Sequence, residues 1–81
     1  MPSVSEVVMY ARRGCHLCDE AREAILGLGD ELGFAYREID IEGDPELERR
    51  HGLRIPVVLV DGREAFEYRV DPGELRRLLE T

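Results

Sequence analysis

Apolar and polar residues follow two different periods in the first part of the chain. The continuous apolar run Val7–Tyr10 predicts a buried strand over about Val4–Tyr10. From Cys15 onward the apolar residues are spaced by three and four positions, which predicts a helix with one buried face. These residues are Leu17, Ala21, Ala24, Ile25 and Leu28. The glycines expected to fray and end this helix are Gly27, Gly29 and Gly33.

The middle of the chain predicts a strand and a short helix. The strand spans about Phe34–Ile41. Asp44 suits an N-cap and Pro45 suits the first helical position, so a second helix is expected to begin there. Gly52 fits the end of this helix. Glu46 and Arg50 are spaced to pair on its solvated face.

The last third predicts a hairpin followed by a helix. The apolar run Pro56–Val60 indicates a strand covered on both faces. Asp61-Gly62 is a strong two-residue turn, which returns the chain as a strand over Arg63–Tyr68. Asp71 is the expected N-cap of the final helix, with Glu74 placed to reach back in a capping box. The buried stripe of that helix is Leu75, Leu78 and Leu79.

The predicted order β-α-β-α-β-β-α defines the fold class. The β-α-β start requires two parallel strands joined by a right-handed crossover, and the hairpin adds an antiparallel pair. We therefore expect an α/β protein with a mixed four-stranded sheet and helices on both faces. Residues 1–81 are expected to form a single domain, because no linker, repeat or low-complexity segment interrupts the pattern.

Composition narrows the class of function. The 81 residues carry a formal net charge of −7, which argues against nucleic acid as a partner. No apolar run resembles a signal peptide or reaches membrane-spanning length, so a cytoplasmic location without membrane binding is expected. Two cysteines are too few for a disulfide scaffold.

Those two cysteines form the motif Cys15-x-x-Cys18 at the junction between the first strand and the first helix. A helix N-terminus favours an anion, and cysteines there have thiol pKa values of roughly 3.5–7.5 instead of about 8.5. The pair is also spaced to close a disulfide and so to carry two electrons. In a cytosolic protein such a motif is catalytic or metal-binding more often than structural.

The motif Cys15-His16-Leu17-Cys18-Asp19, the element order and Ile55-Pro56 before the third strand together resemble the thioredoxin superfamily. The short length is similar to its glutaredoxin branch, and the motif resembles a small bacterial glutaredoxin-like group. The resemblance implies a thiol–disulfide oxidoreductase in which Cys15 is the nucleophile and Cys18 the resolving cysteine. Burial of Cys18 one turn into the helix should raise its pKa.

The resemblance also implies roles for residues around the motif. The Ile55-Pro56 bond is expected to be cis and to border the substrate groove, whereas Pro45 and Pro72 are expected to be trans. Arg12 or Arg13 matches a family position near the thiolate and the glutathione carboxylate, with a solvated loop arginine as the other interpretation. His16 either stabilises the thiolate or is simply exposed. The candidate substrate-binding residues are Arg12, Arg13, His16, Ile55, Pro56, Arg69 and Asp71.

Two departures from the family pattern affect the expected chemistry. Glutaredoxins have a Gly-Gly pair before the last helix, where this chain has Glu67–Asp71. We therefore expect weak binding of glutathione, although Arg69 and the helix start at Asp71 offer a partial substitute. Thioredoxins have a buried acid six residues before the first cysteine, where this chain has Met9.

The expected partners are a disulfide-bearing protein or small molecule and a reductant, either glutathione as a co-substrate or a reductase. No tightly bound cofactor or metal is expected, and a monomer is predicted. Two other classes remain open: a metal or iron–sulfur carrier that uses the cysteines as half of a dimeric site, and a non-catalytic binding module. His51 is expected to interact with carbonyls at its helix end.

Overall fold

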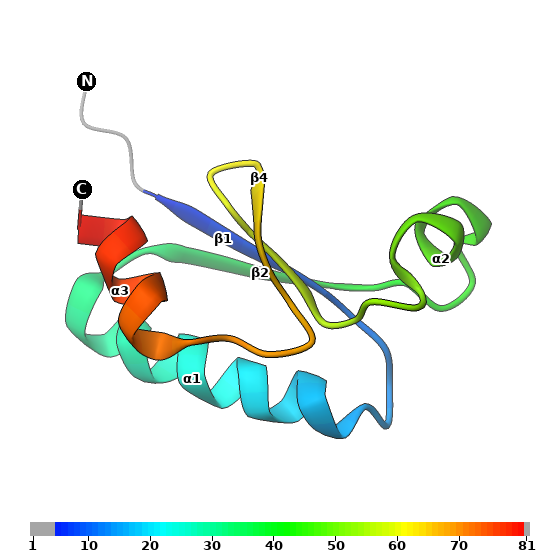
Figure 1. The fold of residues 1–81 in the computed structure, drawn as a ribbon, viewed down its shortest axis with the longest axis horizontal. Helices are drawn as coiled ribbons and strands as arrows, with labels where there is room; N and C mark the ends of the chain where they lie inside the picture. The colour runs from blue at the N-terminus through cyan, green and yellow to red at the C-terminus, as the bar shows by residue number, and fades with distance from the viewer. Residues whose placement is uncertain (1–4, 81) are drawn as a thin grey trace.

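The computed structural model describes residues 5–80, and its elements follow the predicted order (Figure 1). The elements are β1 (Glu6–Ala11), α1 (His16–Leu32), β2 (Ala35–Asp40), α2 (Pro45–His51), β3 (Val57–Val60), β4 (Arg63–Glu67) and α3 (Pro72–Glu80). The predicted start of the first strand, Val4, lies outside the described residues. No helix in the described part of the chain has the length and apolar character needed to cross a bilayer.

The four strands form one mixed sheet in the order β2-β1-β3-β4. β1 and β2 are parallel, and α1 supplies the crossover between them. The pairs β1–β3 and β3–β4 are antiparallel. The predicted fold class, including the mixed four-stranded sheet, is confirmed.

The main core lies between the sheet and the helices α1 and α3, which run along the same side of it (Figure 1). Met9 of β1, Ile25 of α1, Val58 of β3 and Leu75 of α3 are fully buried in this layer. Residues of a strand point alternately to its two faces, so the neighbours of Met9 point away from α1. Burying each such aliphatic side chain contributes about 1.5–3 kcal/mol.

The helix α2 packs on the opposite face and covers only one end of the sheet (Figure 1). Tyr10 points to this face, and its ring stacks on that of His51 with centroids 4.3 Å apart. The limited cover leaves Leu59, which points to this face, partly exposed and so corrects part of the prediction for the third strand. Val57 and Val58 are buried, whereas Leu59 and Val60 are only partly so.

The end of α1 corrects the prediction made from its glycines. The helix continues through Gly27 and Gly29 and ends only at Gly33, whose φ of 66° is left-handed. The N–H of Gly33 donates to the carbonyl of Gly29 at 3.0 Å. Each glycine inside a helix costs about 1 kcal/mol, and burial of Ile25 and Leu28 on the same helix face outweighs that cost.

The hairpin and its exit follow local backbone chemistry. Asp61 and Gly62 both have positive φ, 50° and 85°, as the predicted two-residue turn requires. β4 ends at Glu67, one residue before the predicted end, because Tyr68 leaves the strand with φ of 70°. Tyr68 is therefore a loop residue, contrary to the predicted strand over Arg63–Tyr68.

The short helices are capped as the sequence predicts. The Oδ1 atom of Asp44 accepts from the N–H groups of Glu46 and Leu47 at 3.1 and 3.2 Å. Asp71 caps α3 in the same way, through the N–H groups two and three residues ahead. The capping box is the exception, because the carboxylate of Glu74 pairs with Arg77. Arg50 and Glu46 form the expected ion pair, with 4.0 Å between Nε and Oε2.

Candidate functional site

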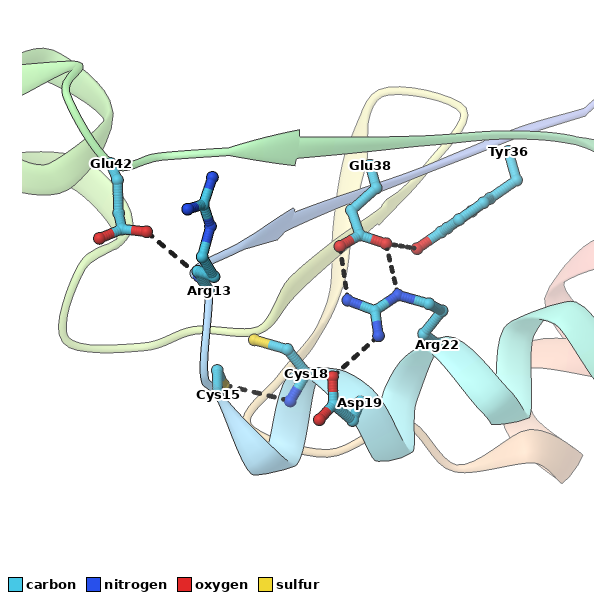
Figure 2. A network of polar contacts seen from close by, with 8 residues as sticks. All are labelled: Arg13, Cys15, Cys18, Asp19, Arg22, Tyr36, Glu38 and Glu42. Carbon is cyan, nitrogen blue, oxygen red and sulfur yellow. Dashed lines mark hydrogen bonds and ion pairs between the residues drawn. The ribbon is translucent and has the colours of Figure 1, made fainter.

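Cys15 is the N-cap of α1, and the helix places its sulfur over the first turn. Its backbone is extended, and its Sγ accepts a hydrogen bond from the N–H of Cys18 at 3.1 Å (Figure 2). Gly14 precedes it with φ of 74°, a left-handed conformation that bends the loop into the helix. Cys15 is partly exposed. Its sulfur therefore combines solvent access with a donor that favours a negative charge.

Cys18 lies one turn further, in a different environment. Its side chain is 1% exposed and belongs to the main core. Burial, followed by the hydrogen bond with Cys15, raises the pKa of Cys18 to about 12, although the Arg12 backbone and the Arg22 charge act in the opposite direction. Both cysteines are free, so the pair is a dithiol of unequal members.

The Ile55-Pro56 bond is cis, as the resemblance implies. It is the only cis bond in residues 5–80, so Pro45 and Pro72 are trans as predicted. Ile55 and Cys15 both pack against the main core cluster. The carbonyl of Pro56 accepts from the N–H of Tyr68 at 2.9 Å. The fold thereby joins the proline loop to the loop before α3.

The two arginines before Cys15 have different surroundings. Arg12 forms an ion pair with Glu48 of α2 at 2.8 Å and lies against Gly52. A Cβ atom added to Gly52 would lie 3.3 Å from the Arg12 Nη2 atom. Arg13 donates its backbone N–H to Glu42 at 3.4 Å, and within residues 5–80 its guanidinium has no ion-pair partner. The Arg12 side chain is thus held against α2, whereas the Arg13 guanidinium is available to bind an anionic group.

Arg69 lies in a different hollow from those two arginines. A cavity of about 170 Å³ is lined by Leu17, Glu20, Ala21, Tyr68, Arg69 and Val70. Arg12 and Arg13 line another cavity, of about 260 Å³, between the β1–α1 loop, α1 and β2. Asp71 occupies the N–H groups of Gly73 and Glu74 with its own carboxylate. The candidate binding residues are therefore divided among separate sites.

The two histidines lie in different surroundings, and the structure agrees with the interpretation of His16 as an exposed residue. His16 is 85% exposed and pairs with Glu20 one turn along α1, at 2.9 Å. His51 is buried against Tyr10, and Arg54 lies 3.3 Å from its Nδ1 atom. The expected interaction of His51 with helix-end carbonyls is wrong, because ring stacking on the sheet fixes the imidazole. Burial and the Arg54 charge lower the pKa of His51.

A network of ion pairs and hydrogen bonds near Cys18 was not predicted from the sequence. Arg22 donates two hydrogen bonds to Glu38 of β2, at 2.7 and 2.6 Å, and one to Asp19 at 2.8 Å (Figure 2). The hydroxyl of Tyr36 also donates to Glu38, at 2.9 Å. The Arg22 hydrogen bonds lower the pKa of Glu38. The spacing of Asp19 and Arg22 is visible in the sequence, whereas their partner on β2 is not.

A metal would find few ligands in one copy of the chain. Among residues 5–80, no three His, Cys, Asp or Glu side chains cluster as a metal site. Cys15 and Cys18 alone supply two sulfur ligands, whereas structural zinc takes four.

Comparison with known sequences places the chain in a family. Residues 6–80 match the glutaredoxin-like domain (DUF836). An uncharacterized protein of Mycobacterium tuberculosis is 40% identical over 76 residues, which cover 88% of this chain and 78% of that one. A glutaredoxin-like protein of Dictyostelium discoideum is 32% identical over 78 residues, covering 89% and 72% of the two chains.

Solved structures agree on the fold. A protein of Nitrosomonas europaea superposes with a TM-score of 0.83 at 28% identity, over 98% of this chain and 95% of that one. A protein of X. campestris gives 0.74 at 37% identity, over 91% and 95%. Thioredoxin of Fasciola hepatica gives 0.63 at 18% identity, over 95% and 79%, a likeness of fold alone.

Proposed function

Because the chain belongs to the family of glutaredoxin-like domains, we propose that it is a thiol–disulfide oxidoreductase. Cys15 is the nucleophile and Cys18 the resolving cysteine. The substrate is a disulfide in a protein or a small molecule. The observation that carries this proposal is the inequality of the two sulfurs, since one is partly exposed at a helix start and the other is buried one turn behind it.

The reaction follows from that inequality. The Cys15 thiolate attacks one sulfur of the substrate disulfide, and the other sulfur leaves with the electron pair and takes up a proton. Cys18 then loses its proton and attacks the Sγ atom of Cys15, which releases the second substrate thiol. The substrate gains two electrons and two protons, and the protein ends with a Cys15–Cys18 disulfide. A reductant must restore the dithiol.

A protein disulfide is the substrate we favour over glutathione mixed disulfides. The helix start of α3, which would receive a carboxylate, has two of its N–H groups bonded to Asp71. Glu20 adds a negative charge to the cavity that Arg69 lines. Both features oppose an anionic ligand. We therefore propose a dithiol reductase as the electron donor. We also propose that the protein acts as a monomer in the cytoplasm.

The proposal is tested with single cysteine variants. Wild-type protein should reduce a protein disulfide with multiple turnovers when a dithiol regenerates it. Cys18→Ser should form a stable mixed disulfide and stall, whereas Cys15→Ser should form none. Labelling with iodoacetamide near neutral pH should be fast in Cys18→Ser and slow in Cys15→Ser. The reverse pattern would refute the assignment, and metal-dependent dimers of the wild type would favour the carrier function instead.

A further inference from the structure

The resolving step presents a physical problem, because Cys18 must become a thiolate in an apolar setting. Its side chain is 1% exposed and packs in the main core. Burial without compensation disfavours the charged form of a thiol. The residue at the thioredoxin acid position, Met9, is fully buried in the same cluster and cannot ionise. A group that stabilises the Cys18 thiolate must therefore lie outside β1.

Arg22 is the cation placed to give that help. It follows Cys18 by four positions on α1, so both side chains lie on one helix face. Figure 2 shows the Cys18 sulfur and the Arg22 guanidinium on the side of α1 that faces β2. The positive charge of Arg22 lowers the pKa of Cys18, against the larger effect of burial.

The guanidinium is held rigidly in this place. Glu38 receives two hydrogen bonds from it across the gap to β2, and Asp19 receives a third from the same helix. Only about a third of the Arg22 side chain, 34%, is exposed. A fixed charge near a buried group requires no reorganisation when the opposite charge appears, which is the condition for effective electrostatic stabilisation.

We propose that Arg22, held by Glu38 and Asp19, stabilises the Cys18 thiolate while it attacks the mixed disulfide on Cys15. In that step Cys18 gives its proton to solvent and forms a bond to the Cys15 Sγ atom, and the substrate sulfur departs with the electron pair. Arg22 acts through Cys18 and is a positioning residue for its charge. The inference rests on the proposed exchange reaction and assigns the residue that makes its second half possible.

Charged residues of both signs lie near Cys18, so a test must separate the effect of Arg22 from the effects of the others. The cavity between the β1–α1 loop, α1 and β2 is lined by the charged residues Arg12, Arg13, Asp19, Arg22, Glu38 and Asp40. The Arg12 guanidinium is paired with Glu48, and Arg12 acts on Cys18 through a backbone hydrogen bond. From β1 the core around Cys18 receives only apolar side chains, Val7, Met9 and Ala11. Arg22 is thus the side-chain cation whose effect on Cys18 the test must isolate.

The experiment follows the second half-reaction directly. Reduced protein is mixed with one equivalent of 5,5′-dithiobis(2-nitrobenzoate), which places a thionitrobenzoate group on Cys15. Attack by Cys18 then releases that group as a coloured thiolate, and the release rate is measured against pH. Because this leaving group remains a thiolate, the pH dependence reports the ionisation of Cys18.

The variants are Arg22→Gln, Arg22→Lys and the matched control Arg76→Gln. Arg76 also bridges two carboxylates, those of Glu31 and Glu80, and its side chain is 38% exposed. We expect Arg22→Gln to slow the release about tenfold below the midpoint and to move the profile to higher pH. Arg22→Lys should recover most of the rate, and Arg76→Gln should match the wild type. Equal profiles for Arg22→Gln and Arg76→Gln would overturn the inference.

A variant that removes a negative charge instead of a positive one keeps the test decisive if Arg22→Gln fails to fold. Glu38→Gln removes a negative charge and leaves one carbonyl oxygen to hold Arg22. The release should then be faster and its profile should move to lower pH, while an unchanged Tm shows that loosened packing around Cys18 is not the cause. Asp19 and the remaining amide oxygen still hold Arg22 in this variant, so an unchanged or slower release in Glu38→Gln overturns the inference. A wild type that never releases the second group would instead refute the proposed function.

Discussion

Replacing Gly52 by alanine tests how the loop after α2 is packed. A Cβ atom at this position would lie 2.4 Å from the carbonyl oxygen of Glu48 and 3.3 Å from Nη2 of Arg12. The φ of Gly52 is −54°, so steric contact and not backbone conformation makes glycine necessary here. The first contact is with backbone, which cannot rotate away. Overpacking of this kind costs about 1–3 kcal/mol.

The expected loss is measurable by thermal unfolding. In a domain of 60–100 residues, 1 kcal/mol shifts Tm by about 4–8 °C, so a cost of about 1–3 kcal/mol should lower the Tm of Gly52→Ala by roughly 4–24 °C. The N–H of Gly52 also donates to the Glu48 carbonyl at 2.8 Å, and that bond must lengthen to admit a methyl group. Circular dichroism against temperature measures the shift, and urea unfolding gives the free energy.

Gly27→Ala is the matched control. Gly27 lies inside α1, and nothing is within 4 Å of an added Cβ atom. Alanine there should raise the free energy of unfolding by about 0.5–1 kcal/mol, because it restricts the unfolded chain and favours the helix. If Gly52→Ala were as stable as the wild type while Gly27→Ala behaved as expected, the contact with Glu48 would not constrain the loop.

Three further predictions concern pH, capping and substrate. The pKa of His51 is lowered by burial and by Arg54, so the unfolded chain binds more protons and stability should fall as pH drops below about 6.5; urea unfolding at two pH values should show a smaller fall in His51→Phe, and an equal fall would contradict this. Asp44→Ala should cost about 1 kcal/mol in the same assay through loss of the α2 cap, and no change would show that the cap is dispensable. Glutathionylated peptide should be turned over more slowly than a protein disulfide, and fast turnover lost on Arg69→Ala would show that this arginine serves a glutathione site.

Features that depend on near neighbours in the chain were predictable from the sequence. The period of apolar residues defines β1 and α1, the Asp44-Pro45 pair starts α2, and the Asp61-Gly62 pair makes the hairpin turn. Each of these signals acts over a few residues, through backbone hydrogen bonding or allowed φ and ψ. The position of Cys15 at a helix start follows from the same local logic. The cis bond before Pro56 was predictable only through resemblance.

Tertiary structure decided which distant residues meet. Arg22 reaches Glu38 and Arg12 reaches Glu48 across 16 and 36 positions, and His51 stacks on Tyr10 of another element. Sequence pattern specifies which residue types lie on a face, but charged and aromatic side chains have many possible partners until the sheet order brings two elements together. The sequence by itself therefore determined the fold class, the cysteine pair and the i,i+4 spacing of Cys18 and Arg22, whereas only the packing of α1 against β2 determined which carboxylate of the sheet holds Arg22.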